Sequence, residues 1–320
     1  MKKLIITLLL LTVCSVHAQT VEKDNLKQLN QKVLVLYRSQ KFDEALKLAL
    51  QAVDLSLKVY GAEQPETANA YRNLGVMYQE TKKYKQSTEN LQKAVDIYQK
   101  MSDSKYEELV LAYQILAYSQ FLDKRKVESE ASYLKAIEIS ENKFGKESKE
   151  SFLATLNLAN IYARLKEIEK ANEFYLKSYV LTMKKFGRES NEFEQVEDSR
   201  SCLISPQKTN SESEKAFVEA RKKILGENDD QGSRILNGKA KSLPLVAYPF
   251  EAKSKRISGM VSVRVKIDEQ GNVIEARTVC GHPILGRASE QGARGAKFAP
   301  TLKDGKPVIV SGIIVYNFVP

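Results

Sequence analysis

The sequence has few of the residues on which most metal sites and many active sites depend. Its 320 residues include no Trp, two His and three Cys, and no two Cys are spaced as C-x-x-C. This scarcity argues against a histidine-based active site, a multi-His metal site and a zinc site, so we expect no cofactor. The remaining composition, 42% apolar and 28% charged residues, is typical of a soluble globular protein, and the length suggests two domains.

The N-terminus has the pattern of an export signal. Two lysines precede an apolar run over residues 4–13, and a small-residue cleavage site ends at Ala18. We expect residues 1–18 to be removed and the mature chain to be exported to the periplasm. As a helix the apolar run would reach about 15 Å, half of a bilayer core, so we expect no transmembrane helix in the mature chain. Lipidation at Cys14 is the alternative, but Val13 is larger than the residue that normally precedes a lipidated Cys.

The excess of positive charge lies in the C-terminal part of the chain. The whole chain has 50 Lys and Arg against 40 Asp and Glu, and residues 234–320 alone have 14 against 6. An exported basic domain would meet acidic peptides, cell-wall polymers or lipid phosphates, and we expect no nucleic-acid partner. A basic surface that only keeps the domain soluble is the alternative.

A 42-residue repeat organises the first half of the chain. A short motif ending in glycine recurs at Gly61, Gly145 and Gly187, with a degenerate copy at Asp103. Two further columns of the same period hold small residues, namely Ala45, Ser87, Ser129 and Ala171 in one and Ala52, Ala94, Ala136 and Ser178 in the other. Because small residues let two helices approach closely, each repeat is predicted to be a helical hairpin that needs the next one to cover its apolar face.

These columns resemble tetratricopeptide repeats, in the 42-residue form of kinesin light chains, over roughly residues 26–193. The resemblance implies a superhelix whose concave face, lined by the first helix of each hairpin, binds extended or helical peptides. The residues expected to face this groove are Asn69, Arg72, Asn73, Gln114, Tyr118, Asn157 and Asn160. Side-chain amides can hold a peptide backbone by both edges. A solvated polar face is the alternative.

After Gly187 the repeat pattern decays into two cap helices. Helices are expected over residues 190–203 and 214–225, which extends the helical solenoid over residues 26–225. A polar stretch at residues 226–234 then predicts the linker to a second domain over residues 235–320.

The second domain changes from helical periodicity to strict alternation. Residues 261–267 alternate apolar and polar side chains, and a turn at residues 268–272 leads to a second strand over residues 273–279. Pro283 then begins a helix, and a last strand is expected over residues 308–318. Three strands and one helix leave a sheet edge whose backbone groups are available for pairing.

The motifs of this domain resemble the C-terminal domain of the TonB family. They are Tyr248-Pro249, Gly271-Asn272-Val273, Gly281-His282-Pro283, Phe298-Ala299-Pro300 and Asp304-Gly305. The resemblance implies a small periplasmic domain that adds a peptide segment of a TonB-dependent outer-membrane transporter to its last strand.

The residues expected to bind that peptide follow from the same resemblance. Main-chain pairing is expected at Val310, Gly312, Ile314 and Tyr316, and Tyr248 and Pro249 form an extended motif of the peptide-binding site. The alternatives are pairing of the last strand with residues 243–249 and self-association with a second copy of the chain.

The chain departs from a TonB energy transducer in its first half. Such a protein has an N-terminal membrane helix and a Pro-rich spacer, whereas this chain has a cleavable signal and helical repeats. Without an anchor there is no route for force, so we expect no energised transport by this protein alone.

Cys202 and Cys280 are the two cysteines of the predicted mature chain. In an oxidising compartment they could form a disulfide. Because they are predicted to lie in different domains, we expect two separately buried thiols instead. Cys280 and His282 would make half of a metal site, which nothing else in the sequence completes.

The combined prediction is a multidomain protein, an all-α tetratricopeptide-type solenoid followed by a small α+β domain of β-β-α-β order. We expect an exported, non-enzymatic adaptor that binds outer-membrane partner peptides through the TonB-like domain and a second partner through the repeats. An accessory component of TonB-dependent transport is the first alternative. A cell-wall-modifying enzyme is the second, because a carboxylate pair assembled by folding leaves no sequence motif.

Overall fold

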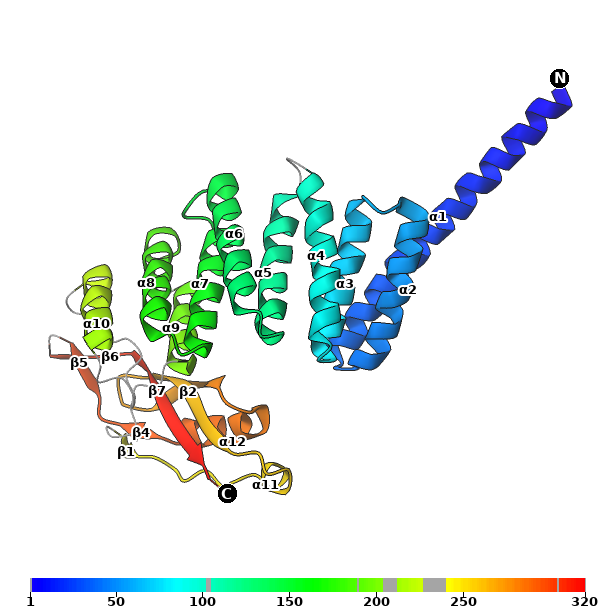
Figure 1. Ribbon diagram of the computed structural model, residues 1–320. Helices are drawn as coiled ribbons and strands as arrows, with labels where there is room; N and C mark the ends of the chain where they lie inside the picture. Colours follow the sequence, from blue (N-terminus) through cyan, green and yellow to red (C-terminus); the bar gives the residue numbers. More distant parts are fainter. Residues whose placement is uncertain are drawn as a thin grey trace. The chain divides into compact units, whose positions relative to one another are not determined.

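The fold is helical in its first two thirds and contains a β-sheet in the remainder (Figure 1). The structure, a computed structural model, describes residues 2–101, 105–188, 190–203, 212–226, 240–303 and 305–319, without the side chains of residues 2–19, 203, 214 and 303. It divides into two compact units, Met1–Leu158 and Ala159–Pro320. No helix of the described part combines the length and apolar composition that a membrane crossing requires.

Two of the expected segments are described only in part. For the export signal at residues 1–18 no side chain is described. Of the expected linker at residues 226–234 only Gly226 is described. Both therefore stay predictions.

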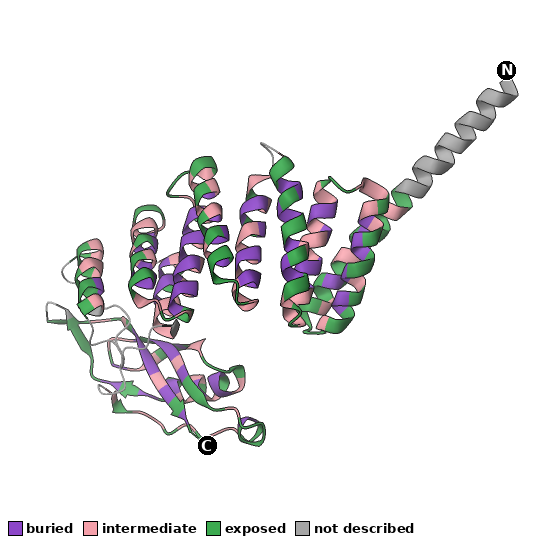
Figure 2. Ribbon diagram, viewed as in Figure 1, coloured by how far each residue is buried: buried purple, intermediate pink, exposed green. Residues whose placement is uncertain are grey.

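The first unit consists of helices, and from the first to the sixth of those described each packs against the next along the chain. They are α1 (Lys2–Arg38), α2 (Phe42–Tyr60), α3 (Pro65–Glu80), α4 (Tyr84–Lys100), α5 (Tyr106–Leu122), α6 (Lys126–Phe144) and α7 (Lys149–Arg164), the last of which crosses into the second unit. Figure 2 shows their buried residues on the faces that meet neighbouring helices. The predicted helical hairpins are confirmed.

The small-residue columns bring the helices of a hairpin together. Ser87 Oγ donates a hydrogen bond to Gly75 O at 2.7 Å, and Ser129 Oγ donates to Ala117 O at 2.7 Å. A side chain at position 75 would collide with Leu91 of the following helix. The same contact therefore recurs one repeat apart and holds the backbone of one helix against the side chains of the next.

The turns of the repeats also have the 42-residue period. The repeated glycines lie between hairpins, where φ is +92° at Gly61 and +93° at Gly145. The turn within each hairpin has its own left-handed residue, and these residues are Gln40, Lys82, Lys124 and Lys166. The glycine column is visible in the sequence, whereas this second column is not, because glutamine and lysine are unusual in the left-handed region.

The second unit begins with helices that cap the repeats. After α7 come α8 (Ile168–Lys185), α9 (Asn191–Leu203) and α10 (Glu212–Leu225). Helices α8 and α10 pack together, and α9 contacts both α8 and a strand of the sheet. The helices expected over residues 190–203 and 214–225 are thus present, and α9 joins the helical and β-rich parts of this unit.

The sheet of the second unit has three antiparallel strands in the order β3-β2-β7. These are β2 (Gly259–Ile267), β3 (Val273–Cys280) and β7 (Val310–Phe318), with α12 (Pro283–Arg294) between β3 and β7 in sequence. The core between sheet and helix includes Val263 and Ile314, which are opposite each other in the register, together with Leu285. The predicted order of strand, strand, helix and strand is confirmed.

Several short elements were not expected from the sequence. Strand β1 (Ala240–Ser242) pairs with β4 (Lys297–Phe298), β5 (Thr301–Lys303) pairs with β6 (Lys306–Val308), and α11 (Phe250–Ser254) follows the Tyr248-Pro249 motif. The last strand expected over residues 308–318 is divided, because Val308 ends β6 and Val310 begins β7. Elements of two to five residues are too short to show a period.

Candidate functional site

Strand β7 is an edge strand in the described part of the chain. It pairs with β2 along its whole length, from Val310 opposite Ile267 to Phe318 opposite Gly259, and with no other described strand. Residues 243–249 are not in a strand, so the alternative in which they pair with β7 does not occur among the described residues. An edge strand is the expected place for an added peptide.

The contacts of β3 reveal which backbone groups of the sheet face which neighbour. Thr278 N donates to Glu290 Oε1 at 2.6 Å, and Ala276 O accepts from Arg294 Nη2 at 3.1 Å, so these two residues turn their backbone groups away from β2. Backbone groups alternate along a strand, so Arg277 faces β2, where it is opposite Arg264.

The same alternation applies to the other side of β2. Since Arg264 faces β3, its neighbours Val263 and Val265 face β7, where they are opposite Ile314 and Gly312. The four predicted pairing residues, Val310, Gly312, Ile314 and Tyr316, therefore direct their amide and carbonyl groups toward β2. The residues whose backbone groups face outward are Ser311, Ile313, Val315 and Asn317. Peptide pairing at this strand stays a prediction, and by this geometry it would use the outward-facing residues, one position away from the four predicted.

The opposite edge of the sheet is covered by side chains of α12. Glu290 and Arg294, one helical turn apart, contact the outward-facing backbone of Thr278 and Ala276. The amide of Thr278 holds the pKa of Glu290 below its usual value, so this carboxylate stays charged and continues to accept the hydrogen bond. Side chains that occupy an edge protect it from further strand pairing. The two edges of the sheet therefore differ.

Tyr248 positions the extended segment that precedes α11. Its ring packs against that of Phe318 with centroids 5.6 Å apart, and its hydroxyl donates to Ile257 O at 2.7 Å. Pro249 is the N-cap residue of α11. Tyr248 thus lies near the C-terminal end of β7 and ties residue 257 to it, while Pro249 precedes the first residue of α11.

Tyr316 gives the β-rich part a predicted pH dependence. Burial raises the pKa of its hydroxyl to about 12, and Oη has no hydrogen-bond partner among the described residues. A tyrosine exposed in the unfolded chain has a pKa of about 10. The stability that the neutral, buried Tyr316 contributes is therefore fully present below that pH and is lost as the pH rises toward 12. We expect Tyr316→Phe to lose less stability than the native protein between pH 9 and 11 (about one unit either side of that reference).

The measurement for Tyr316 is the urea midpoint of both proteins at the two pH values. The comparison with the phenylalanine variant cancels the contributions of other tyrosines. Equal losses in the two proteins would contradict the prediction.

Most of the predicted groove residues in the repeats are engaged in side-chain hydrogen bonds. In the first unit, Asn157 Nδ2 donates to Gln114 Oε1 at 2.7 Å, and Asn69 Oδ1 accepts from Tyr98 Oη at 2.8 Å. Asn73 Nδ2 lies 3.5 Å from Oδ1 of Asn30, a residue that the sequence reasoning missed. The pairs Asn157–Gln114 and Asn73–Asn30 therefore join equivalent helices of successive repeats, whereas Asn69 joins the two helices of one hairpin.

The other predicted groove residues are placed as follows. Asn160, in the second unit, accepts from Tyr175 Oη at 2.8 Å. Arg72 and Tyr118 are half-buried, and Tyr118 stacks on Phe121 with centroids 6.1 Å apart. All seven predicted side chains are half-buried, which leaves part of each one accessible to a ligand.

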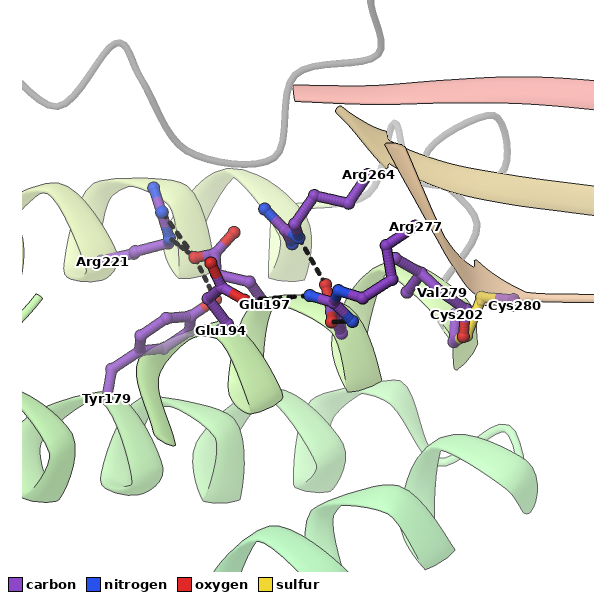
Figure 3. Close-up of polar contacts among 10 residues, drawn as sticks. Tyr179, Glu194, Glu197, Cys202, Arg221, Arg264, Arg277, Val279 and Cys280 are labelled. Carbon is purple, nitrogen blue, oxygen red and sulfur yellow. Dashed lines mark hydrogen bonds and ion pairs between the residues drawn. A yellow bond between two sulfur atoms is a disulfide. The ribbon is translucent and has the colours of Figure 1, made fainter. Parts of the chain in front are cut away.

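The expectation of two separate thiols at Cys202 and Cys280 is wrong. The two residues form a disulfide with Cα atoms 5.5 Å apart (Figure 3). The expectation assumed that the cap helix and the sheet belong to different domains, whereas α9 packs against β3 in the same compact unit. Within the described residues, no group of three or more His, Cys, Asp or Glu is arranged to hold a metal ion.

Comparison with known proteins gives the class of each part. Residues 28–100 match the tetratricopeptide repeat family, and residues 244–320 match the family of the Gram-negative bacterial TonB protein C-terminal domain. The chain therefore contains a tetratricopeptide-repeat region followed by a TonB C-terminal domain, as both resemblances implied. No curated protein matches the chain.

Solved structures are similar to the helical part. The nearly identical TPR-like repeats of a putative kinesin light chain from Podosopora anserina are 16% identical, with a TM-score of 0.52, and the match covers 64% of this chain and 97% of that one. A variant form of the same repeats has the same identity and TM-score, and there the match covers 63% of this chain and 95% of that one. At this identity the similarity shows the fold alone, a solenoid-like array of helical repeats.

Proposed function

We propose that this protein is an exported, non-enzymatic adaptor that binds a partner peptide at β7 by strand addition and a second protein through its repeats. The observation that carries the proposal is the difference between the two edges of the sheet. Glu290 and Arg294 cover β3, whereas β7 pairs only with β2 among the described residues. Both matched families are interaction modules.

Strand addition suits a ligand recognised by its backbone. A peptide beside β7 would form main-chain hydrogen bonds with outward-facing residues such as Ser311 and Ile313, which requires little of its sequence. The 14 Lys and Arg against 6 Asp and Glu in residues 234–320 would favour an acidic segment. We propose that this segment belongs to a TonB-dependent outer-membrane transporter.

The proposed location is the periplasm. The pattern at residues 1–18 supports export, and the Cys202–Cys280 disulfide supports an oxidising compartment, since disulfides are rare where thiols are kept reduced. The family matched by residues 244–320 is described as Gram-negative bacterial.

The test is a pull-down from solubilised cell envelope with the chain from residue 19 onward. Ser311→Pro removes an outward-facing amide from an edge strand without removing a hydrogen bond to β2, and Ser311→Ala is the matched control that keeps the amide. We expect outer-membrane transporters to be retained by the native chain and by Ser311→Ala and to be lost with Ser311→Pro. Circular dichroism establishes that each variant is folded. Equal retention by a folded Ser311→Pro protein would exclude binding at this edge.

The second partner is proposed to bind in the repeat groove. The amide pair of Asn157 and Gln114 bridges neighbouring repeats and is half-buried, so an extended peptide would contact an already ordered set of donors and acceptors. Because the repeats and β7 are different surfaces, a Ser311→Pro protein that loses transporters should still retain this partner.

A further inference from the structure

Helix α9 presents a single polar stripe to the outer face of the sheet. Glu194, Asp198 and Cys202 are spaced four residues apart and so lie on one side of the helix. Each contacts β2 or β3. Glu194 and Asp198 do so through ion pairs. Cys202 does so through the disulfide to Cys280, which Figure 3 shows. The stripe joins α9 to the sheet over two turns of helix.

Asp198 is the centre of the ionic part of this contact. Its Oδ1 accepts from Arg264 Nε at 2.6 Å and its Oδ2 accepts from Arg277 Nη1 at 2.7 Å. Arg277 also donates to Glu194 Oε2 at 2.9 Å. The Asp198 and Arg264 side chains are 16% and 10% exposed, so separating them would leave a charge in a poorly hydrated place.

The opposite side of α9 is tied to the helices. Glu197 Oε1 accepts from Tyr179 Oη of α8 at 2.6 Å and from Arg221 Nη2 of α10 at 2.6 Å. Helix α9 is therefore held on one side by the last helices of the repeat region and on the other by the sheet that contains β7. Of these two sides, the one that faces the sheet includes a covalent bond, the Cys202–Cys280 disulfide.

We propose that α9 is a redox-sensitive latch between the helices of the second unit and the TonB-type sheet. With the disulfide formed, α8–α10 and the sheet move as one body. A dithiol reductant transfers two electrons and two protons to the disulfide, which becomes the thiols of Cys202 and Cys280, while the dithiol becomes a disulfide. The sheet is then held against α9 by the ion pairs and by non-covalent packing, and it separates from α9 more often.

Two observations make this latch responsive. The cysteines are half-buried, so a small dithiol can reach them. They are 78 residues apart in sequence, so the disulfide closes a long loop, and its loss restores considerable freedom to the separated state. The latch is independent of the proposed peptide binding, since it concerns how the edge strand is held and not what binds there.

The test is hydrogen exchange of the mature chain, oxidised and after treatment with dithiothreitol. We expect amide exchange in α9 and β3 to become at least about tenfold faster on reduction and to stay unchanged in α3 and α4 of the first unit. After reduction, 1 M salt should accelerate it further, because at that concentration charges are screened beyond about 3 Å and the ion pairs weaken. A Cys202→Ser, Cys280→Ser double variant should have the raised exchange with or without dithiothreitol, which separates the latch from other effects of the reductant.

Two results would overturn the latch. One is two free thiols at Cys202 and Cys280 in mass spectra of protein purified from an oxidising compartment. The other is unchanged exchange in α9 and β3 after complete reduction, which would mean that the ion pairs suffice to hold the sheet. If the double variant does not fold, reduction of the native chain still gives a decisive answer, because it starts from folded protein.

Discussion

Replacing Glu197 with alanine is expected to destabilise the second unit by about 3–5 kcal/mol. Glu197 is 2% exposed, and its Oε1 accepts hydrogen bonds from Tyr179 Oη and Arg221 Nη2, both at 2.6 Å. Alanine removes the carboxylate that compensates the charge of Arg221, whose side chain is 13% exposed. Burial raises the pKa of Tyr179 well above its usual value, so near neutral pH this residue stays a neutral donor and cannot take over the role of the carboxylate.

Glu194→Ala is the matched control for Glu197→Ala. Glu194 lies one turn away on the same helix and is also paired with an arginine, but its side chain is 51% exposed and that of Arg277 is 44% exposed. We expect a cost of about 0–1 kcal/mol for this pair. The measurement is the urea midpoint of amide exchange in α8 and α9, which reports the second unit by itself. Equal midpoints for the two variants would contradict the argument from burial.

Replacing Gly271 with alanine is expected to destabilise the β-rich part by about 2–4 kcal/mol. Gly271 has a φ of +87° in the turn between β2 and β3, and an added Cβ would collide with the backbone carbonyl of Phe298. The same two residues are joined by a hydrogen bond from Phe298 N to Gly271 O at 2.9 Å. The clash cannot be relieved by rotating a side chain, so the turn or β4 must move.

Gly305→Ala separates the clash from the backbone conformation. Gly305 has a φ of +75°, but its Cβ would meet no atom of the described residues within 4 Å. We expect a cost of about 1 kcal/mol, that of a left-handed alanine alone. The measurement is the urea dependence of exchange in β2 and β3 for both variants. If Gly305→Ala costs as much as Gly271→Ala, contact with Phe298 is not the cause.

The repeats illustrate how far local pattern predicts structure. The sequence predicted the period of 42 residues, the glycines between hairpins and the repeated positions of Ala and Ser. These features are local, because they reflect contacts within a repeat or with the next one. The left-handed turn residues Lys82, Lys124 and Lys166 were not readable, since the fold imposes that conformation on residues that do not favour it. The partner of Asn73 was missed because Asn30 precedes the first clear repeat motif.

The sheet shows which features of the candidate site the sequence pattern could not predict. Alternation of apolar residues identified β2, β3 and the strand that contains β7, because one face of each is buried. It could not identify which backbone groups of β7 face outward, since this depends on how β2 divides its hydrogen bonds between two neighbours. The protection of β3 by Glu290 and Arg294 likewise requires α12 to cross that strand, which no spacing in the sequence indicates.

The sequence by itself determined the two kinds of fold and their order along the chain, because hydrophobic period and turn residues are local properties. It also predicted an edge strand at the C-terminal end of the chain. Only the tertiary structure decided the pairing of Cys202 with Cys280, the ion pairs of Asp198 and the burial of Glu197. These depend on α9 lying between other helices and the sheet. Such contacts join residues from 18 to 79 positions apart, so they are determined by packing and not by periodicity.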